Sequence, residues 1–189
     1  MFKNVKTLLL ATITIALIAG CDGPPRPGHK AEPVKVSADA KTVYVSSKAT
    51  YTGKQIAQNI KDECKIDSQV MDFIKVYAAK RNIDVIIDGT PKASDTVLKI
   101  SIVDAISGRG MGYGGHNKYI IIKGNLYKGK KLQSSFTAAR KSGGGYFGMY
   151  RSSCSVLGSC AKTLGRDSAD WLVTPTKNAK LGDLFLIQR

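Results

Sequence analysis

The alternation of apolar and polar residues is most regular between residues 95 and 140, where it has the two-residue period of half-buried strands. We predict strands over 95–106 and 119–128, followed by a third strand through 132–138. The apolar faces of these runs contain Leu98, Ile100 and Ile102, then Ile120, Ile122, Gly124 and Leu126, then Leu132, Ser134, Phe136 and Ala138. Because the link at 128–130 is short, the last two runs are predicted to pair as an antiparallel hairpin.

Apolar residues recur with the helical period in three other parts of the chain. Helices are predicted over 55–64, over 69–81 with Asp67 or Ser68 as the N-cap and Asn82 as the stop, and over 158–171 with Pro175 as the stop. Short strands are predicted at 42–46 and 83–88, and the apolar tail 181–187 is predicted to form an edge strand or an extended strap. The pattern therefore predicts a single α+β domain, with helices packed on one face of a mainly antiparallel sheet.

The first 21 residues have the pattern of a bacterial export signal. A short basic segment with Lys3 and Lys6 precedes the apolar run 8–19, which is too short to cross a bilayer comfortably as a helix. The small residues before Cys21 resemble the bacterial lipobox. This resemblance implies cleavage before Cys21 and diacylation of its thiol, which gives stable anchoring to a membrane. The alternatives are a plain secretory signal or a short membrane helix.

The residues after Cys21 are predicted to form a tether. The segment 23–33 holds four of the six prolines and has no apolar periodicity. We divide the chain into a signal peptide (1–20), a lipidated cysteine with a flexible tether (21–40) and a single α+β domain (41–189). Asp22 resembles the inner-membrane retention signal of enteric bacteria. The rule differs in other bacteria, so the protein is expected to face the periplasm from either the inner or the outer membrane.

Basic residues outnumber acidic residues by 29 to 14, and removal of Lys3 and Lys6 with the signal leaves 27 against 14, a formal charge of +13. This balance favours anionic partners such as phospholipid headgroups, lipopolysaccharide or acidic glycans. A basic surface without a specific partner is the alternative. The periplasmic address argues against nucleic acid as a partner.

Alkylation of Cys21 leaves three thiols in an oxidising compartment, so one disulfide and one free thiol are expected. The short spacing favours the pair Cys154 and Cys160. Cys64 reaches either of them if its helix packs nearby, so all three pairings stay open. The thiols have no close-spaced ligand pair of the zinc type, and we predict neither a metal site nor a cofactor.

Catalytic patterns are sparse in the sequence. The run 110–115 has the spacing G-x-G-x-x-G, but a strand rather than a helix is predicted after it, which does not suit a dinucleotide site. Of the two histidines, His29 lies in the tether and His116 stands beside the glycine run. The acidic residues are scattered, so the sequence favours a protein that is not an enzyme.

Two glycine-rich loops, at 107–117 and 141–153, are predicted to leave the same end of the sheet if the three long strands form a meander. The candidate ligand-binding residues there are Arg109, Tyr113, His116, Lys118, Arg140, Lys141, Tyr146, Phe147, Tyr150 and Arg151. Cationic and aromatic side chains of this kind suit anionic or glycan ligands. The alternative is that the aromatic residues of the second loop fold back as a lid over the sheet edge.

The segment from Val97 to Trp171 carries a set of recognisable motifs. They are the run 97–104, Gly124-Asn125-Leu126, Ser142-Gly143-Gly144-Gly145, the run 154–160 between two cysteines, and Leu164-Gly165-Arg166-Asp167. This set resembles a group of proteobacterial lipoproteins of unknown function. At the level of the fold, the chain is also similar to small α+β lipoproteins of envelope assembly, such as the curli-secretion and penicillin-binding-protein-activator lipoproteins. The resemblance supplies no catalytic residues, and the chain has no evident pore-forming hairpin.

Together these patterns predict a non-enzymatic, lipid-anchored cell-envelope protein that binds or supports another envelope component. The partner expected is an envelope protein or an anionic glycan or lipid. The alternative is a periplasmic binder of an anionic ligand or glycan, or a hydrolase inhibitor, that uses the two glycine-rich loops. The identity of the partner and the oligomeric state stay open.

Overall fold

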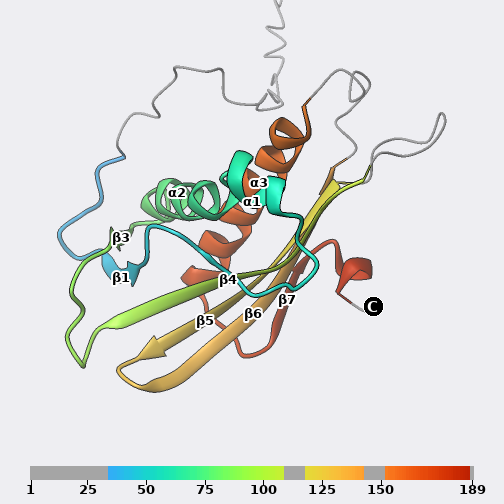
Figure 1. Ribbon diagram of the computed structural model, residues 1–189. Coiled ribbons are helices and arrows are strands. Elements are labelled where there is room, and N and C mark those ends of the chain that lie inside the picture. Colours follow the sequence, from blue (N-terminus) through green and yellow to red (C-terminus); the bar gives the residue numbers. More distant parts are fainter. Residues whose placement is uncertain (1–33, 109–117, 143–151, 188–189) are drawn as a thin grey trace, which may run out of the picture.

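The computed structural model describes residues 34–108, 118–142 and 152–187, which form one α+β domain (Figure 1). The elements are β1 (Lys41–Val45), β2 (Thr50–Tyr51), α1 (Gln58–Glu63), α2 (Ile66–Ala79), β3 (Ile83–Ile87), β4 (Thr96–Ser107), β5 (Lys118–Lys128), β6 (Lys131–Ser142), α3 (Ser153–Val173), β7 (Ala179–Gly182) and the 3₁₀ helix η2 (Leu184–Leu186). The predicted signal peptide, Cys21 and most of the predicted tether lie outside the described residues.

The centre of the sheet is the antiparallel meander that the alternating pattern predicts. Strand β5 pairs with β4 on one side and with β6 on the other along nearly their whole lengths, with a bulge in β4 between Ile102 and Asp104. Gly129, at φ +59, turns the chain between β5 and β6, a conformation that glycine adopts without steric cost. The hairpin prediction is confirmed.

The flanking strands add parallel pairs, so the sheet is mixed, although the long β4–β5 and β5–β6 ladders keep it mainly antiparallel, as predicted. The strand order is β3-β1-β4-β5-β6-β7, with β2 beside β4, and β1–β3, β1–β4, β2–β4 and β6–β7 are parallel pairs. The chain runs from β1 through α1 and α2 to β3, and from β6 through α3 to β7. A helix between two strands lets the second run in the same direction as the first, which period-two patterning does not reveal.

Helices α2 and α3 cover one face of the sheet, as predicted (Figure 1). Ile74 of α2, Leu164 of α3 and Ile122 of β5 are fully buried, and they belong to one continuous apolar core. The alternate positions of β4, β5 and β6 point to the opposite face and are mostly half-buried or exposed; among the described residues no α-helix packs there, and the 3₁₀ helix η2 covers only a part of it. We call this side the open face.

The helix boundaries differ from those expected. Helix α3 begins five residues earlier than predicted, because the Ser152 hydroxyl caps it by accepting a hydrogen bond from the Ser155 amide at 3.2 Å. Helix α1 begins at Gln58 and α2 at Ile66, separated by Lys65 in the left-handed conformation, so neither Asp67 nor Ser68 is the N-cap. The predicted stop at Asn82 is late, since α2 ends at Ala79 with Lys80 as its C-cap, and Asn82, with a φ of +55°, lies in the turn just before β3.

Gly124 allows an aromatic pair to pack between the sheet and α3. A Cβ atom at this position would lie 2.1 Å from Cε1 of Phe136, so the ring fills the place of a side chain. Phe136 in turn meets Trp171 of α3 edge to face, with 4.7 Å between the ring centroids. This contact fixes the middle of β6 beneath the C-terminal half of α3.

Candidate functional site

One end of the sheet brings three strand ends together. Ser107 of β4 lies opposite Lys118 of β5, and Lys118 lies opposite Ser142 of β6. Since neighbouring strands are about 4.8 Å apart, these three residues span only about 10 Å. We call this end the rim, and both glycine-rich segments leave the sheet there.

Most of the ligand-binding residues that the sequence predicts fall outside the described residues. They are Arg109, Tyr113, His116, Tyr146, Phe147, Tyr150 and Arg151. Their role in ligand binding therefore stays a prediction. The structure places the residues that flank them, together with Lys118, Arg140 and Lys141.

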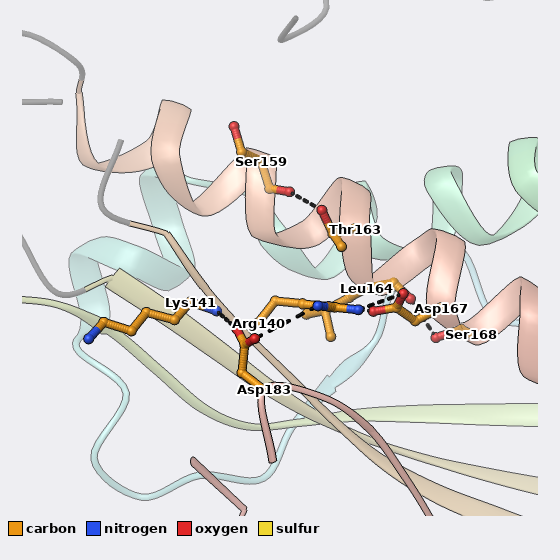
Figure 2. Close-up of polar contacts among 8 residues, drawn as sticks. All are labelled: Arg140, Lys141, Ser159, Thr163, Leu164, Asp167, Ser168 and Asp183. Atoms are coloured by element: carbon orange, nitrogen blue, oxygen red, sulfur yellow. Dashed lines mark hydrogen bonds and ion pairs between the residues drawn. The ribbon is translucent and has the colours of Figure 1, made fainter. Parts of the chain in front are cut away.

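Arg140 points under α3 rather than outward at the rim (Figure 2). Its Nε donates to Oδ2 of Asp167 at 2.6 Å and its Nη2 donates to Oδ1 of the same carboxylate at 3.0 Å. Asp183 lies 3.8 Å from its Nη1 on the other side. The hydrogen bond to Asp167 is the main cause that raises the pKa of Arg140, so this guanidinium joins β6 to α3 and to the C-terminal segment.

Lys141 keeps its side chain on the open face. Its backbone N–H donates to Oδ2 of Asp183 at 2.6 Å, and its ammonium lies 5.9 Å from the centroid of Phe185 in η2. The side chain itself is exposed. Of the three candidates that the structure describes, Lys141 is therefore the one whose charge is presented to solvent.

Lys118 is a buried cation at the base of the rim. Only 3% of the residue is exposed, and burial lowers the pKa of its ammonium. Beside it, a cavity of about 660 Å³ opens between α1, the end of β4 and the start of α3, with Ile60, Ala105 and Ser107 among its walls. The Ser107 hydroxyl is buried and has no hydrogen-bond partner among the described residues. The rim therefore combines a hollow with polar groups that have lost contact with water.

The disulfide joins Cys64 to Cys154 and not Cys154 to Cys160, the pair that the spacing favoured. Cys154 and Cys160 lie within α3, six residues apart, so they are about 9 Å apart along the axis and point in different directions. Cys64 ends α1 and meets the first turn of α3, with 4.7 Å between the Cα atoms. The bond therefore ties the α1–α2 segment to α3 close to the rim.

Cys160 is a buried thiol and not a reactive one. Burial raises its pKa to about 12, and its Sγ lies 4.0 Å from the carbonyl oxygen of Lys118. A thiol with so high a pKa stays protonated at neutral pH and is a poor nucleophile. No group of three metal-ligating side chains gathers within 34–108, 118–142 and 152–187.

Basic charge is concentrated in the sheet layer. The described strands contain nine basic and two acidic residues, whereas the described α-helices contain four basic and six acidic ones. The sequence total of +15 does not reveal this division.

Asp167 and Asp183, the partners of Arg140, were not among the expected site residues, because nothing in their local sequence links them to β6.

The comparisons with known proteins come from solved structures. No family model matches the chain, and no curated protein matches it. A DUF330 protein from Xanthomonas campestris superposes with a TM-score of 0.50 at 12% identity, over 74% of this chain and 90% of that chain. The likeness shows the fold alone. It supports the single α+β domain described above.

Two further solved structures are less similar. The PelC dodecamer of Paraburkholderia phytofirmans has a TM-score of 0.44 at 12% identity, over 71% of this chain and 92% of that chain. Lipoprotein GNA1162 of Neisseria meningitidis has a TM-score of 0.41 at 11% identity, over 69% of this chain and 99% of that chain. Within the part of the chain that the structure describes, no helix is long and apolar enough to cross a bilayer.

Proposed function

We propose that this chain is a lipid-anchored protein of the bacterial cell envelope whose domain binds another envelope component and catalyses no reaction. Cys21 carries the lipid, and the Pro-rich segment after it tethers the domain. The partner binds at the rim, where the two glycine-rich segments begin and end.

The observation that carries this proposal is the register of Ser107, Lys118 and Ser142 across three neighbouring strands. A rigid sheet that holds the bases of two loops side by side is a common way to build a binding site. The cavity of about 660 Å³ beside the rim gives a partner a concave surface to enter.

A second candidate function is a binder of an anionic ligand or glycan at the same rim. The sequence supplies Arg109, Arg151 and Lys141 there, and arginine suits carboxylate and phosphate groups. This candidate differs from the first in the size and chemistry of the partner.

Two measurements test the proposal in the full-length chain expressed in a bacterium. The intact mass of the mature protein is expected to show an N-terminus at Cys21 with a diacylglyceryl group. For the rim, the triple variant Arg109→Gln/Lys141→Gln/Arg151→Gln is compared with Lys128→Gln/Lys130→Gln/Lys131→Gln, which removes the same charge at the opposite end of the sheet.

We expect the rim variant to lose the partners that crosslink to the wild-type protein in membranes, and the opposite-end variant to retain them. Equal retention by both variants contradicts binding at the rim. An unprocessed N-terminus, or cleavage without lipid, contradicts the anchor. Arg140 is left intact because its substitution would disturb the contact between β6 and α3.

A further inference from the structure

The open face of the sheet has a polar centre rich in lysine. Across β4, β5, β6 and β7 the register aligns Ser101, Lys123, Thr137 and Lys180 in one row, and the next row contains Lys99, Asn125 and Ser135. Lys99, Lys123 and Lys180 are exposed. Strand spacings put Lys123 and Lys180 about 10 Å apart, with Lys99 at a similar distance from Lys123.

Negative charge is nearly absent from this part of the face. Within β4 to β7, Asp104 is the acidic residue that points to the open face, and its Oδ2 accepts a hydrogen bond from the Tyr119 hydroxyl at 2.8 Å. The ammonium of Lys99 lies 5.3 Å from the ring centroid of Tyr127. Among the described residues, none of Lys99, Lys123 and Lys180 forms an ion pair with a carboxylate.

Exposed apolar side chains flank the lysines at both ends of the strands. Leu132 lies opposite Tyr127 at the hairpin end and is 45% exposed, and Ile106 lies opposite Tyr119 at the rim end. Next to the rim, η2 presents Leu184 and Phe185, and Phe185 is 53% exposed. Leu186 of η2 turns inward to a cavity of about 430 Å³ on the same face.

We propose that the open face docks flat against an anionic lipid bilayer, with the lysines on the headgroups and Phe185, Leu184, Ile106 and Leu132 at the acyl boundary. Basic residues flanked by aromatic and aliphatic ones are the composition of surfaces that lie in a membrane interface. The docking deepens the proposed function, since it rests on an anchor that keeps the domain close to a membrane.

A bilayer fits this face better than a polymer does. The lysines come from β4, β5 and β7 and are spread across the sheet rather than placed along a groove, so an extended chain would contact only some of them at once. The three α-helices on the other side contain four basic and six acidic residues, and Lys65, Lys80 and Arg81 at the ends of α2 bring that layer close to neutral, so it attracts an anionic membrane less than the sheet does. Charge therefore favours one orientation, in which the sheet faces the bilayer and the helices face away.

The test measures lysine reactivity toward an acetylating reagent in the lipidated protein, held in nanodiscs of phosphatidylglycerol or of phosphatidylcholine. Docking predicts that Lys99, Lys123 and Lys180 react several-fold more slowly in the anionic discs. Lys65, Lys75 and Lys80, exposed in the helix layer, serve as internal controls and are expected to react equally in both. The lipid anchor is present in both kinds of disc. A difference in lysine reactivity therefore reports contact of the open face with the headgroups and not the presence of the anchor.

Binding of the unacylated chain to vesicles separates this proposal from the anchor. Each lysine near an anionic surface strengthens binding about fivefold, so Lys99→Gln/Lys123→Gln/Lys180→Gln is expected to weaken partition to phosphatidylglycerol vesicles about 100-fold. The control Lys65→Gln/Lys75→Gln/Lys80→Gln is expected to change it little. Phe185→Ser, which keeps the charge, is expected to weaken it about fivefold.

The docking is overturned if the two triple variants lose vesicle binding equally. It is also overturned if Lys99, Lys123 and Lys180 react equally in the two kinds of disc. Protection of the three lysines by soluble alginate but not by anionic discs overturns it too, and would assign the face to a glycan. If the protein carries no lipid in cells but its unacylated chain still binds anionic vesicles, the anchor is contradicted and the docking of the open face is not. Circular dichroism checks that each variant is folded.

Discussion

Arg140 and Asp167 form a two-pronged ion pair between β6 and α3, with donor–acceptor distances of 2.6 and 3.0 Å (Figure 2). The pair is partly shielded, since the side chains of Arg140 and Asp167 are 28% and 12% exposed. A residue expected at the rim as a ligand contact therefore contributes to the stability of the fold.

Substitution Arg140→Ala is expected to lower the free energy of unfolding by about 2 kcal/mol, because it leaves the Asp167 carboxylate partly buried and unpaired. Urea denaturation measures the change. Arg166→Ala removes an exposed arginine one residue from Asp167 and is expected to cost about 0.5 kcal/mol or less. If Arg140→Ala is as stable as the wild type, the pair has no structural role.

The sequence predicts the central meander because β4, β5 and β6 follow a two-residue period along most of their lengths. Register shifts interrupt it in β4 and near Tyr127, and the second one places Leu132 on the open face rather than on the apolar face that the sequence predicts. The sequence does not predict the pairing of β1 with β3 or of β6 with β7, because parallel pairs across a helix leave no local mark. The bond between Cys64 and Cys154 is missed for a similar reason. Their separation of 90 residues in the sequence is closed by the packing of α2 against α3, which brings the end of α1 to the first turn of α3.

The site is predicted less completely than the fold. Period two places Lys99 on the open face, yet a single strand does not show that Lys123 and Lys180 share that face. Arg140 was assigned to the rim by its position in the sequence. Its partners Asp167 and Asp183 come from α3 and from the segment after β7, and only the tertiary structure brings them to it.

Removal of the disulfide is expected to lower the free energy of unfolding by about 4 kcal/mol, because the bond closes a loop of some 90 residues in the unfolded chain. Cys64→Ser and Cys154→Ser should therefore be equally destabilised, and a reducing agent should add nothing to either. Peptide mapping without reduction identifies the linked pair. A Cys154–Cys160 peptide would refute the pairing.

The stability of the domain is expected to fall as the pH rises above about 8.5, in part because of Cys160. Its pKa is about 12 in the folded state, against about 8.5 in an unfolded chain. Between these values the unfolded chain releases the thiol proton and the folded domain keeps it, so alkali favours unfolding. Cys160→Ala is expected to reduce the slope of stability with pH over this window, as measured by denaturation at pH 8 and pH 10. An unchanged slope contradicts the buried thiol.

Gly165 marks the close crossing of α3 over α2. A Cβ atom there would lie 2.4 Å from the Cβ of Phe73 and 2.8 Å from the Phe73 carbonyl carbon, so Gly165→Ala is expected to cost about 3 kcal/mol. Gly158→Ala, in the same helix, meets only the flexible end of Gln69 and is expected to be nearly neutral. Thermal unfolding compares the two variants. Similar melting temperatures would show that the helices do not cross so closely.

Photo-crosslinking in intact cells tests the central claim, that an anchored domain holds its partner at the rim, most directly. A photoreactive residue replaces Ser107 at the rim in one variant and Lys130 at the opposite end of the sheet in another, and crosslinked products are identified by mass spectrometry. We predict an envelope component crosslinked from position 107 and not from position 130. Products that are absent at both positions, or the same at both, would contradict the claim.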